Sequence, residues 1–414
     1  MLPTKFHITF SLLSIYAVSL HAQQTFRGRV VDASTGEPLP YVIFKMIDKR
    51  GTLSNVDGYY VLYAEPSDKV TVSFVGYEPQ IYKAKKLPDE IRMKPLTSTL
   101  TEVKPIPIEN IMLKFIKKLN KENSIWASYY NYYFFRQRTS NPDYGEVVVE
   151  AFFWAFSSIN INHPRFVNGR KYYAKKTERV KDSDISSYTQ SNIHHLLCLS
   201  PEVPLGGRNR LTERLNFPLP EWATEISDLE GRTFTCTEII SEKGDNLYKV
   251  DIRVDPKRSA EAAGLRPELN NIRLSSEHAL SGTMYIKKKN LHLVSFDGKL
   301  EGYYAKEYYT DGEMTTPVDV RIHIDYTHRL NFTEPISIHC TMKYGNKKTH
   351  FVAFKVATTH MIRRMKILWG MEEDMIETID STGYKEKIYK EDIILRSQKE
   401  EEIVRKAMET DSIR

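Results

Sequence analysis

The chain has 414 residues, of which 41% are hydrophobic, and a formal net charge of +6 at pH 7. Lysine and arginine are interleaved with aspartate and glutamate, so there is no basic stripe of the kind that binds nucleic acid, and no nucleic-acid partner is expected. The length allows two or three domains with their own cores, and the 25 tyrosines favour β structure.

Residues 1–22 have the pattern of a secretory signal peptide. Lys5 supplies positive charge, residues 8–20 are largely apolar, and Ala22 suits the position before a cleavage point. The apolar run is shorter than the ~20 residues that a membrane-spanning helix needs, and no later run is long enough. No cysteine follows it to carry a lipid anchor. We therefore expect an exported protein of the periplasm or outer membrane, with no transmembrane helix in the mature chain.

Residues 23–96 are predicted to form a seven-stranded, immunoglobulin- or transthyretin-like β-sandwich. Short apolar runs alternate with turn residues at intervals of about 8–12 residues. Gly36 and Pro38 mark a first turn, because glycine tolerates positive φ and proline prevents a helix from continuing. Residues 55–58, Asn-Val-Asp-Gly, mark a second. No acid, base and nucleophile converge in this region, so we interpret it as scaffold.

Three segments of this region resemble the carboxypeptidase-like regulatory domain, the transthyretin-like module at the front of many Bacteroidetes outer-membrane proteins. They are GRVVDASTGEPLPYV (28–42), NVDGYYVL (55–62) and VSFVGYEPQ (72–80). The resemblance implies a folded, non-catalytic accessory module. It does not imply carboxypeptidase activity, which belongs to a separate zinc domain in the proteins that gave the module its name.

A linker and a helix are predicted to follow. Residues 97–108 are polar and stiffened by Pro105 and Pro107. Residues 109–395 then form a β-rich α+β domain of unassigned activity, opened by a helix over residues 109–120. The apolar residues of this helix recur at helical spacing: Met112, Phe115, Ile116 and Leu119. Lysines lie opposite, which favours a solvated face over a membrane-binding one.

Three β-rich segments open the second domain: YYFFRQ (132–137), VVVEAFFWAF (147–156) and NGRKY (168–172). They resemble the second region of the same Bacteroidetes proteins, where a strand with an FYRE-like core precedes a strand containing Glu-Ala. Gln137 stands here where that pattern has an acidic residue. The resemblance implies location and architecture rather than an activity.

Residues 182–222 are the least regular part of the chain and the place where a ligand would be sought. His194 and His195 are adjacent, so they point to different sides of a strand or helix and are unsuited to sharing one metal ion. Residues 206–210, Gly-Gly-Arg-Asn-Arg, could hold an anion through backbone amides and guanidinium groups. A plain loop is the favoured interpretation, because no strand–loop–helix context accompanies them.

Alternating strands dominate the rest of the domain, over residues 233–254, 281–302, 318–326, 336–344 and 349–356. They predict a curved antiparallel sheet, with a half-barrel as one form. GTMYIKKKNLHLVSFDGKL (282–300) resembles the repeated hairpin of lipoprotein-carrier half-barrels, in which an apolar face holds acyl chains. An ordinary sheet packed on helices is the alternative. Residues 396–414 are expected to form an amphipathic helix and tail, with four residues on its apolar side: Ile403, Val404, Ala407 and Met408.

The sequence contains none of the usual catalytic motifs. Zinc-protease, nucleophile-elbow, phosphate-loop, dinucleotide and Cys-x-x-Cys patterns are missing. Asn55, Asp57 and Gly58 match part of a calcium loop but lack its distal glutamate, so turn chemistry explains them. Cys198, Cys236 and Cys340 are predicted to be small buried side chains, with one disulfide as the alternative. We assign no catalytic, cofactor-binding or metal residue and no cofactor, and the ligand-binding residues are unassigned.

The resulting hypothesis is a non-catalytic envelope protein that acts by binding a protein or a ligand, with an envelope protein or outer-membrane complex as its partner. One alternative is a carrier or sensor of a lipid or other apolar ligand, for which the curved sheet should enclose an apolar cavity. The other is a hydrolase with dispersed residues, for which a nucleophile and a base should meet in a cleft.

Overall fold

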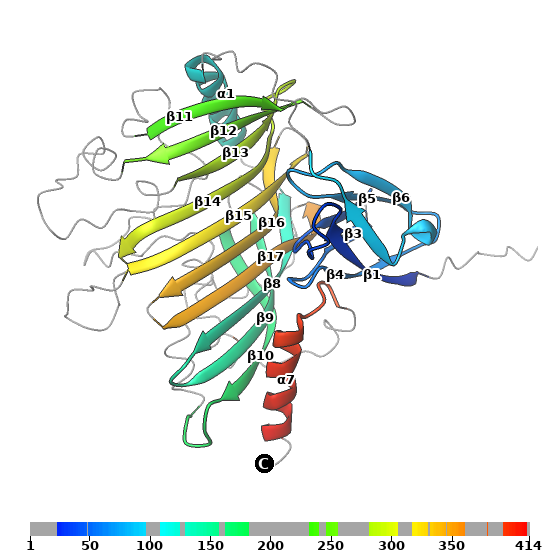
Figure 1. The fold of residues 1–414 in the computed structure, drawn as a ribbon, viewed down its shortest axis with the longest axis vertical. Coiled ribbons are helices and arrows are strands. Elements are labelled where there is room, and N and C mark those ends of the chain that lie inside the picture. Colours follow the sequence, from blue (N-terminus) through cyan, green and yellow to red (C-terminus); the bar gives the residue numbers. More distant parts are fainter. Residues whose placement is uncertain are drawn as a thin grey trace, which may run out of the picture.

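The computed structural model describes residues 23–47, 49–96, 108–124, 129–156, 162–181, 232–239, 246–255, 281–304, 317–329, 332–344, 346–360, 379 and 392–411. The predicted signal peptide, most of the predicted linker, His194, His195, Cys198 and residues 206–210 lie outside them. The described residues form an amino-terminal β-sandwich and a large open sheet (Figure 1).

The sandwich has the seven strands that the sequence predicts. One sheet has the order β4-β1-β7, and the other β3-β2-β5-β6. Their bounds are β1 Gln24–Asp32, β2 Ile43–Met46, β3 Lys49–Leu53, β4 Tyr59–Ala64, β5 Lys69–Ser73, β6 Gln80–Lys83 and β7 Glu90–Met93, with a 3-10 turn at Ala84–Lys86. Alternate residues of these strands, including Val30, Phe44, Tyr60, Val72 and Ile91, fill the space between the sheets.

The Asn55 turn is made by side-chain hydrogen bonds. Asn55 Oδ1 accepts from the backbone N–H groups of Asp57, at 3.0 Å, and Tyr59, at 2.9 Å. Gly58 has a φ of 80°, which a side chain would strain. Turn chemistry therefore accounts for these residues, as the sequence predicts.

The large sheet contains ten antiparallel strands in the order β10-β9-β8-β17-β16-β15-β14-β13-β12-β11 and does not close into a barrel. The strands are β8 Tyr129–Asn141, β9 Gly145–Phe156, β10 Asn162–Lys175, β11 Arg232–Ile239, β12 Leu247–Val254, β13 Ser281–Lys287, β14 Leu293–Tyr304, β15 Pro317–Arg329, β16 Phe332–Tyr344 and β17 Lys347–His360. Two meanders are joined where β8 pairs with β17. The sequence predicts the hairpins but not this joint.

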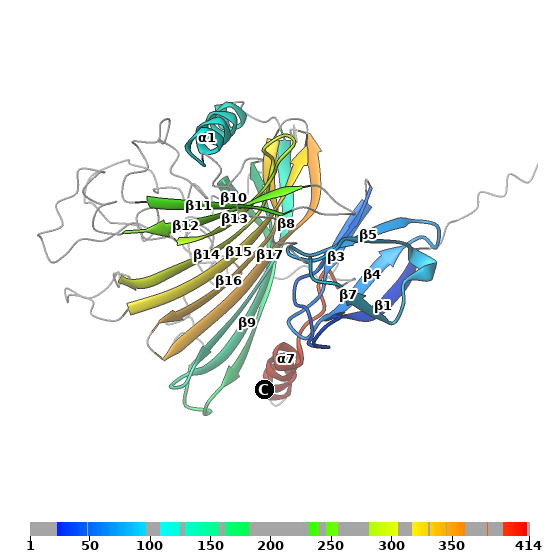
Figure 2. The ribbon, with the colours of Figure 1, turned by 45° about the horizontal axis from the view of Figure 1, so that its top comes forward.

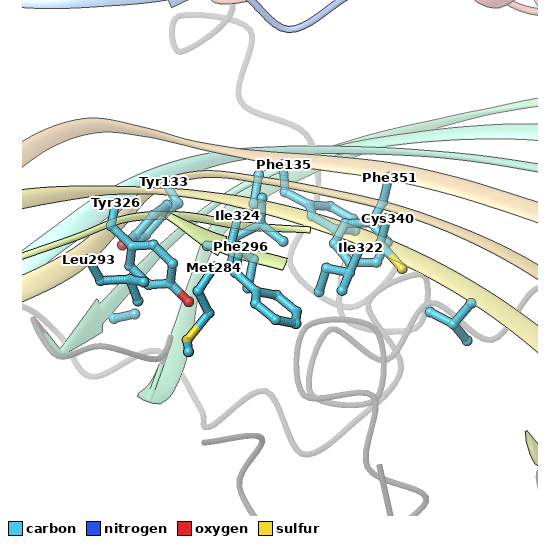
Figure 3. Close-up of a cluster of buried hydrophobic side chains, with 14 of the residues drawn as sticks. Tyr133, Phe135, Met284, Leu293, Phe296, Ile322, Ile324, Tyr326, Cys340 and Phe351 are labelled. Carbon is cyan, nitrogen blue, oxygen red and sulfur yellow. The ribbon is translucent and has the colours of Figure 1, made fainter. Parts of the chain in front are cut away.

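One face of the sheet is apolar and carries helix α1, Ile108–Ser124. Side chains from almost every strand gather there, among them Tyr133, Phe296, Ile322 and Phe351 (Figure 3). The four helix residues predicted to be apolar, Met112, Phe115, Ile116 and Leu119, are buried against them. The predicted helix is therefore confirmed; it begins one residue earlier than predicted and ends four residues later.

The opposite face carries the sandwich and the carboxyl-terminal helix α7, Gln398–Asp411 (Figure 2). Ile43 and Leu53 of the sandwich pack with Phe134 and Val352 of the sheet. In α7, Ile403, Val404 and Ala407 are buried, as predicted. Met408 is 55% exposed, which corrects the predicted apolar side: it lies at the edge of the buried face, about 40° around the helix from Val404 and about 140° from Ile403. None of the described helices is long and apolar enough to cross a membrane.

Candidate functional site

A row of directly paired residues crosses all ten strands on the face that carries the sandwich. Paired residues in neighbouring strands share a face of the sheet, so their side chains lie side by side. The row reads, from β11 to β10, Thr235, Asp251, Thr283, Asp297, His323, His339, Val352, Arg136, Glu150 and Arg170. Nine of these ten residues are polar, whereas the other face is a hydrophobic core. Polar side chains that could bind a ligand or act as acids and bases are therefore concentrated in this row.

His323 stands between two carboxylates. Its Nδ1 lies 2.5 Å from Asp297 Oδ1, and its Nε2 lies 3.1 Å from Asp325 Oδ2. Burial lowers the pKa of His323, but Asp325 and then Asp297 outweigh that effect and raise it to about 10. His323 is therefore an imidazolium at neutral pH, and two carboxylates stabilise its single positive charge.

His339 and His350 lie beside it under a side chain from the sandwich. The Tyr41 ring stacks on His339, with ring centroids 3.7 Å apart, and its hydroxyl hydrogen-bonds with His350 Nε2. Burial lowers the pKa of His350 to about 4 and that of His339 well below its ordinary value. Tyr41 has a φ of 63°, a strained backbone conformation for an aromatic residue of the kind that clusters at functional sites.

A cavity of about 570 Å³ lies between the two modules at this point. Pro40, Tyr41 and Phe74 of the sandwich form one wall. The sheet forms the other through residues of β13 to β17, including Thr283, Asp297, Lys299, Arg321, His323, His339, Thr341 and His350. The sandwich, interpreted from the sequence as scaffold alone, thus supplies part of a site.

The next row of the sheet gives this cavity its charge. Lys299 is paired directly with Arg321, Arg321 with Thr341, and Thr341 with His350. Lys299 and Arg321 thus place two cationic side chains next to each other on the wall of the cavity, where positive charge attracts an anion. Among the charged side chains that line the cavity, Lys299, Arg321 and the imidazolium of His323 outnumber the single carboxylate of Asp297, so the sheet wall is cationic.

The cavity does not present an activated nucleophile among its described residues. Tyr41 and His350 are in hydrogen-bond contact, but burial raises the pKa of Tyr41 well above its ordinary value and makes His350 a weak base. Cys340 is buried, and burial raises the pKa of its thiol too. The arrangement is suited to holding a ligand by charge and hydrogen bonds.

At the other end of the first row, Glu150 is fully buried and contacts three arginines. Arg136 Nε lies 2.7 Å from Oε1, Arg170 Nε 2.5 Å from Oε2, and Arg396 Nη2 2.9 Å from Oε2. Burial raises the pKa of Glu150, but Arg136, Arg396 and Arg170 together hold it well below its usual range. Gln137 lies on the apolar side of the sheet, where its Nε2 donates to Thr139 Oγ1 at 2.9 Å. The acidic side chain that contacts the arginines here is therefore that of Glu150, and Gln137 lies on the opposite face of the sheet.

The sequence did not predict either the histidine cluster or the arginine cluster around Glu150. His323, His339 and His350 come from three different strands, β15, β16 and β17, and become neighbours only through strand pairing. The sequence does carry one indication of the polar face: in each strand, isolated polar residues alternate with the apolar ones and so lie on the opposite face of the sheet. Of the two cysteines that the structure describes, Cys340 is buried as predicted and Cys236 is only half-buried, and both are free thiols.

Comparison with known proteins identifies the first module. Residues 26–104 match the CarboxypepD_reg-like domain, as the quoted segments predict. No curated protein matches the sequence.

Two solved structures are similar at a low level. A LolA superfamily protein from Nitrosomonas europaea is 10% identical, with a TM-score of 0.23, over 62% of this chain and 96% of that one. An outer membrane lipoprotein-sorting protein domain from Vibrio parahaemolyticus is 8% identical, with a TM-score of 0.22, over 61% and 94%. These values are too low to transfer a fold or a function to this chain.

Proposed function

We propose that the chain is an exported binding protein of the cell envelope that holds a small anionic molecule between its sandwich and its sheet. The observation that carries the proposal is the cavity of about 570 Å³ formed by both modules. Its volume falls within the range of about 300–1,000 Å³ that is usual for small-molecule sites.

The charge of the cavity selects the class of ligand. Lys299 and Arg321 are exposed and directly opposed across β14 and β15. A carboxylate or phosphate at Arg321 could accept a bidentate pair of hydrogen bonds from the guanidinium group, with the ammonium group of Lys299 on the neighbouring strand adding positive charge. Thr341 and the Tyr41–His350 pair supply neutral hydrogen-bonding groups beside them.

Calorimetric titration of the purified chain with inorganic phosphate and with a short dicarboxylate tests the proposal. Arg321→Gln should weaken binding about tenfold or more, since a hydrogen bond to a charged group contributes about 1.5–3 kcal/mol. Lys343→Gln is the matched control, because Lys343 is an exposed cation of β16 outside the cavity lining. Equal affinities for all three proteins would contradict the proposal, as would no binding of either anion by the unaltered chain.

The apolar face of the sheet supports a second candidate, a carrier of a lipid or another apolar molecule. Its apolar side chains extend across the sheet from β10 to β11, and α1 packs across them. An acyl chain could lie on this surface beside α1. Native mass spectrometry of the chain purified without denaturant tests this candidate, because a carrier should retain co-purified lipid.

A protein partner in the envelope stays a prediction. A module of the CarboxypepD_reg-like type recurs as an accessory domain, and here the sandwich also packs on the chain's own sheet. A pull-down from envelope extract that recovers no stable partner would contradict this part of the hypothesis.

A further inference from the structure

A second group of chemically capable side chains lies far from the cavity, where α1 crosses the apolar face. Glu122 belongs to α1, His292 to the turn between β13 and β14, and His328 to β15. One ligand atom from each lies within 4.8 Å of the others. Residues distant in the sequence are thus brought within the span of one metal ion.

The carboxylate of Glu122 is held in place by Thr333 of β16. Thr333 donates to Glu122 Oε2 from its hydroxyl, at 2.7 Å, and from its N–H, at 3.2 Å. Glu122 Oε1 is paired with Lys118 one turn earlier in the helix. The ammonium group of Lys118 therefore already neutralises this carboxylate. The hydrogen bonds from Thr333 orient it.

The two imidazoles are adjacent and incompletely bonded. Their ring centroids are 3.4 Å apart in a stacked arrangement. The Nδ1 atom of His328 is buried and has no hydrogen-bond partner. A buried polar atom without a hydrogen-bond partner destabilises the folded state. Coordination of a metal ion by this nitrogen would supply the missing partner.

We propose that Glu122, His292 and His328 bind a divalent transition-metal ion of the zinc class. Two imidazole nitrogens and one carboxylate oxygen are donors that Zn²⁺ accepts, with a fourth position left for water. Binding requires the stacked rings to turn so that their nitrogens converge, and it requires Lys118 to release Oε1. The ion would join α1 to the β13–β14 turn and to β15, and this role is independent of the ligand in the interdomain cavity.

The experiment is a titration of the full, tag-free, chelator-treated chain with Zn²⁺, and with Co²⁺ as a spectroscopic probe. The expected result is one equivalent bound per chain, a rise in the thermal midpoint of unfolding, and a Co²⁺ spectrum typical of a four-coordinate site. Glu122→Gln and His328→Gln should each weaken binding at least about tenfold.

Two further variants separate loss of the site from loss of the fold. Lys118→Gln should strengthen binding, because it removes the cation that competes at Glu122, and a misfolded protein would not show this gain. The double variant His194→Gln/His195→Gln should bind Zn²⁺ as the unaltered chain does. No binding by the unaltered chain, or binding that is lost only in the His194/His195 variant, would overturn the proposal.

Discussion

At the scale of single residues, Glu150 shows how strongly one buried charge can depend on its partners. Its carboxylate is fully buried and contacts Arg136, Arg170 and Arg396. Two of these arginines come from neighbouring strands, and the third comes from the carboxyl-terminal segment. Removing the charge would take from three guanidinium groups the carboxylate that they share in a poorly hydrated place, and the remaining ion pairs of Arg136 with Glu400 and of Arg396 with Glu401 are longer, at 3.7 Å.

Glu150→Gln should therefore lower the free energy of unfolding by about 3–5 kcal/mol. Urea denaturation measures this change. Glu409→Gln serves as the control, since Glu409 pairs with Arg405 on the exposed side of α7 and such a pair contributes at most about 1 kcal/mol. A loss below about 1 kcal/mol for Glu150→Gln would show that the arginines find other partners.

The histidines of the cavity predict a dependence of stability on pH with two opposite arms. His350, with a pKa lowered from 6.5 to about 4, and His339, whose pKa burial also holds well below its ordinary value, resist protonation in the folded chain. Stability should fall as the pH drops below 6.5, because the unfolded chain takes up protons first. His323, raised to about 10, acts oppositely: its contribution is complete below pH 6.5 and is lost as the pH rises toward 10.

Urea denaturation across this pH range tests both arms. His350→Gln should flatten the acid arm, and His323→Gln should flatten the alkaline one. Profiles for both variants that run parallel to that of the unaltered chain would show that other groups control the pH dependence.

At the scale of elements, the sequence predicts most helices and strands because alternation and helical spacing are local properties. The apolar residues of α1 and the hairpin of β13 and β14 follow directly from them. The pairing of β8 with β17 does not, since alternation shows which residues share a face and not which strands are neighbours. For the same reason, the meeting of His323, His339 and His350 could not be predicted.

The start of α7 is a second element-scale feature that a short pattern encodes. Ser397 Oγ accepts from the N–H of Glu400 at 3.3 Å, and Glu400 Oε2 accepts from the N–H of Ser397 at 2.7 Å, which is a capping box. Ser397→Ala should lower the free energy of unfolding by about 1 kcal/mol, whereas Ser397→Asn should stay near the original value. Chemical denaturation of the two variants checks this, and equal losses would contradict the capping role.

At the scale of the whole molecule, the segment before α7 connects the two modules. Thr52 Oγ1 donates to the Ile393 carbonyl at 2.7 Å, and Asn55 Nδ2 donates to the Arg396 carbonyl at 3.0 Å. From the sheet, Arg136 donates to the carbonyls of Ile394 and Leu395. One short segment is thus bonded to both the sandwich and the sheet, and it fixes the gap in which the cavity lies.

The central claim is that both modules together hold a small anion. Hydrogen-exchange mass spectrometry of the full chain, with and without saturating phosphate, tests it most directly. The account predicts slower exchange on both walls of the cavity: at Tyr41 and Phe74 in the sandwich, and around Asp297 and Arg321 in the sheet. Slower exchange confined to one module, or confined to α1 and the apolar face, would contradict it.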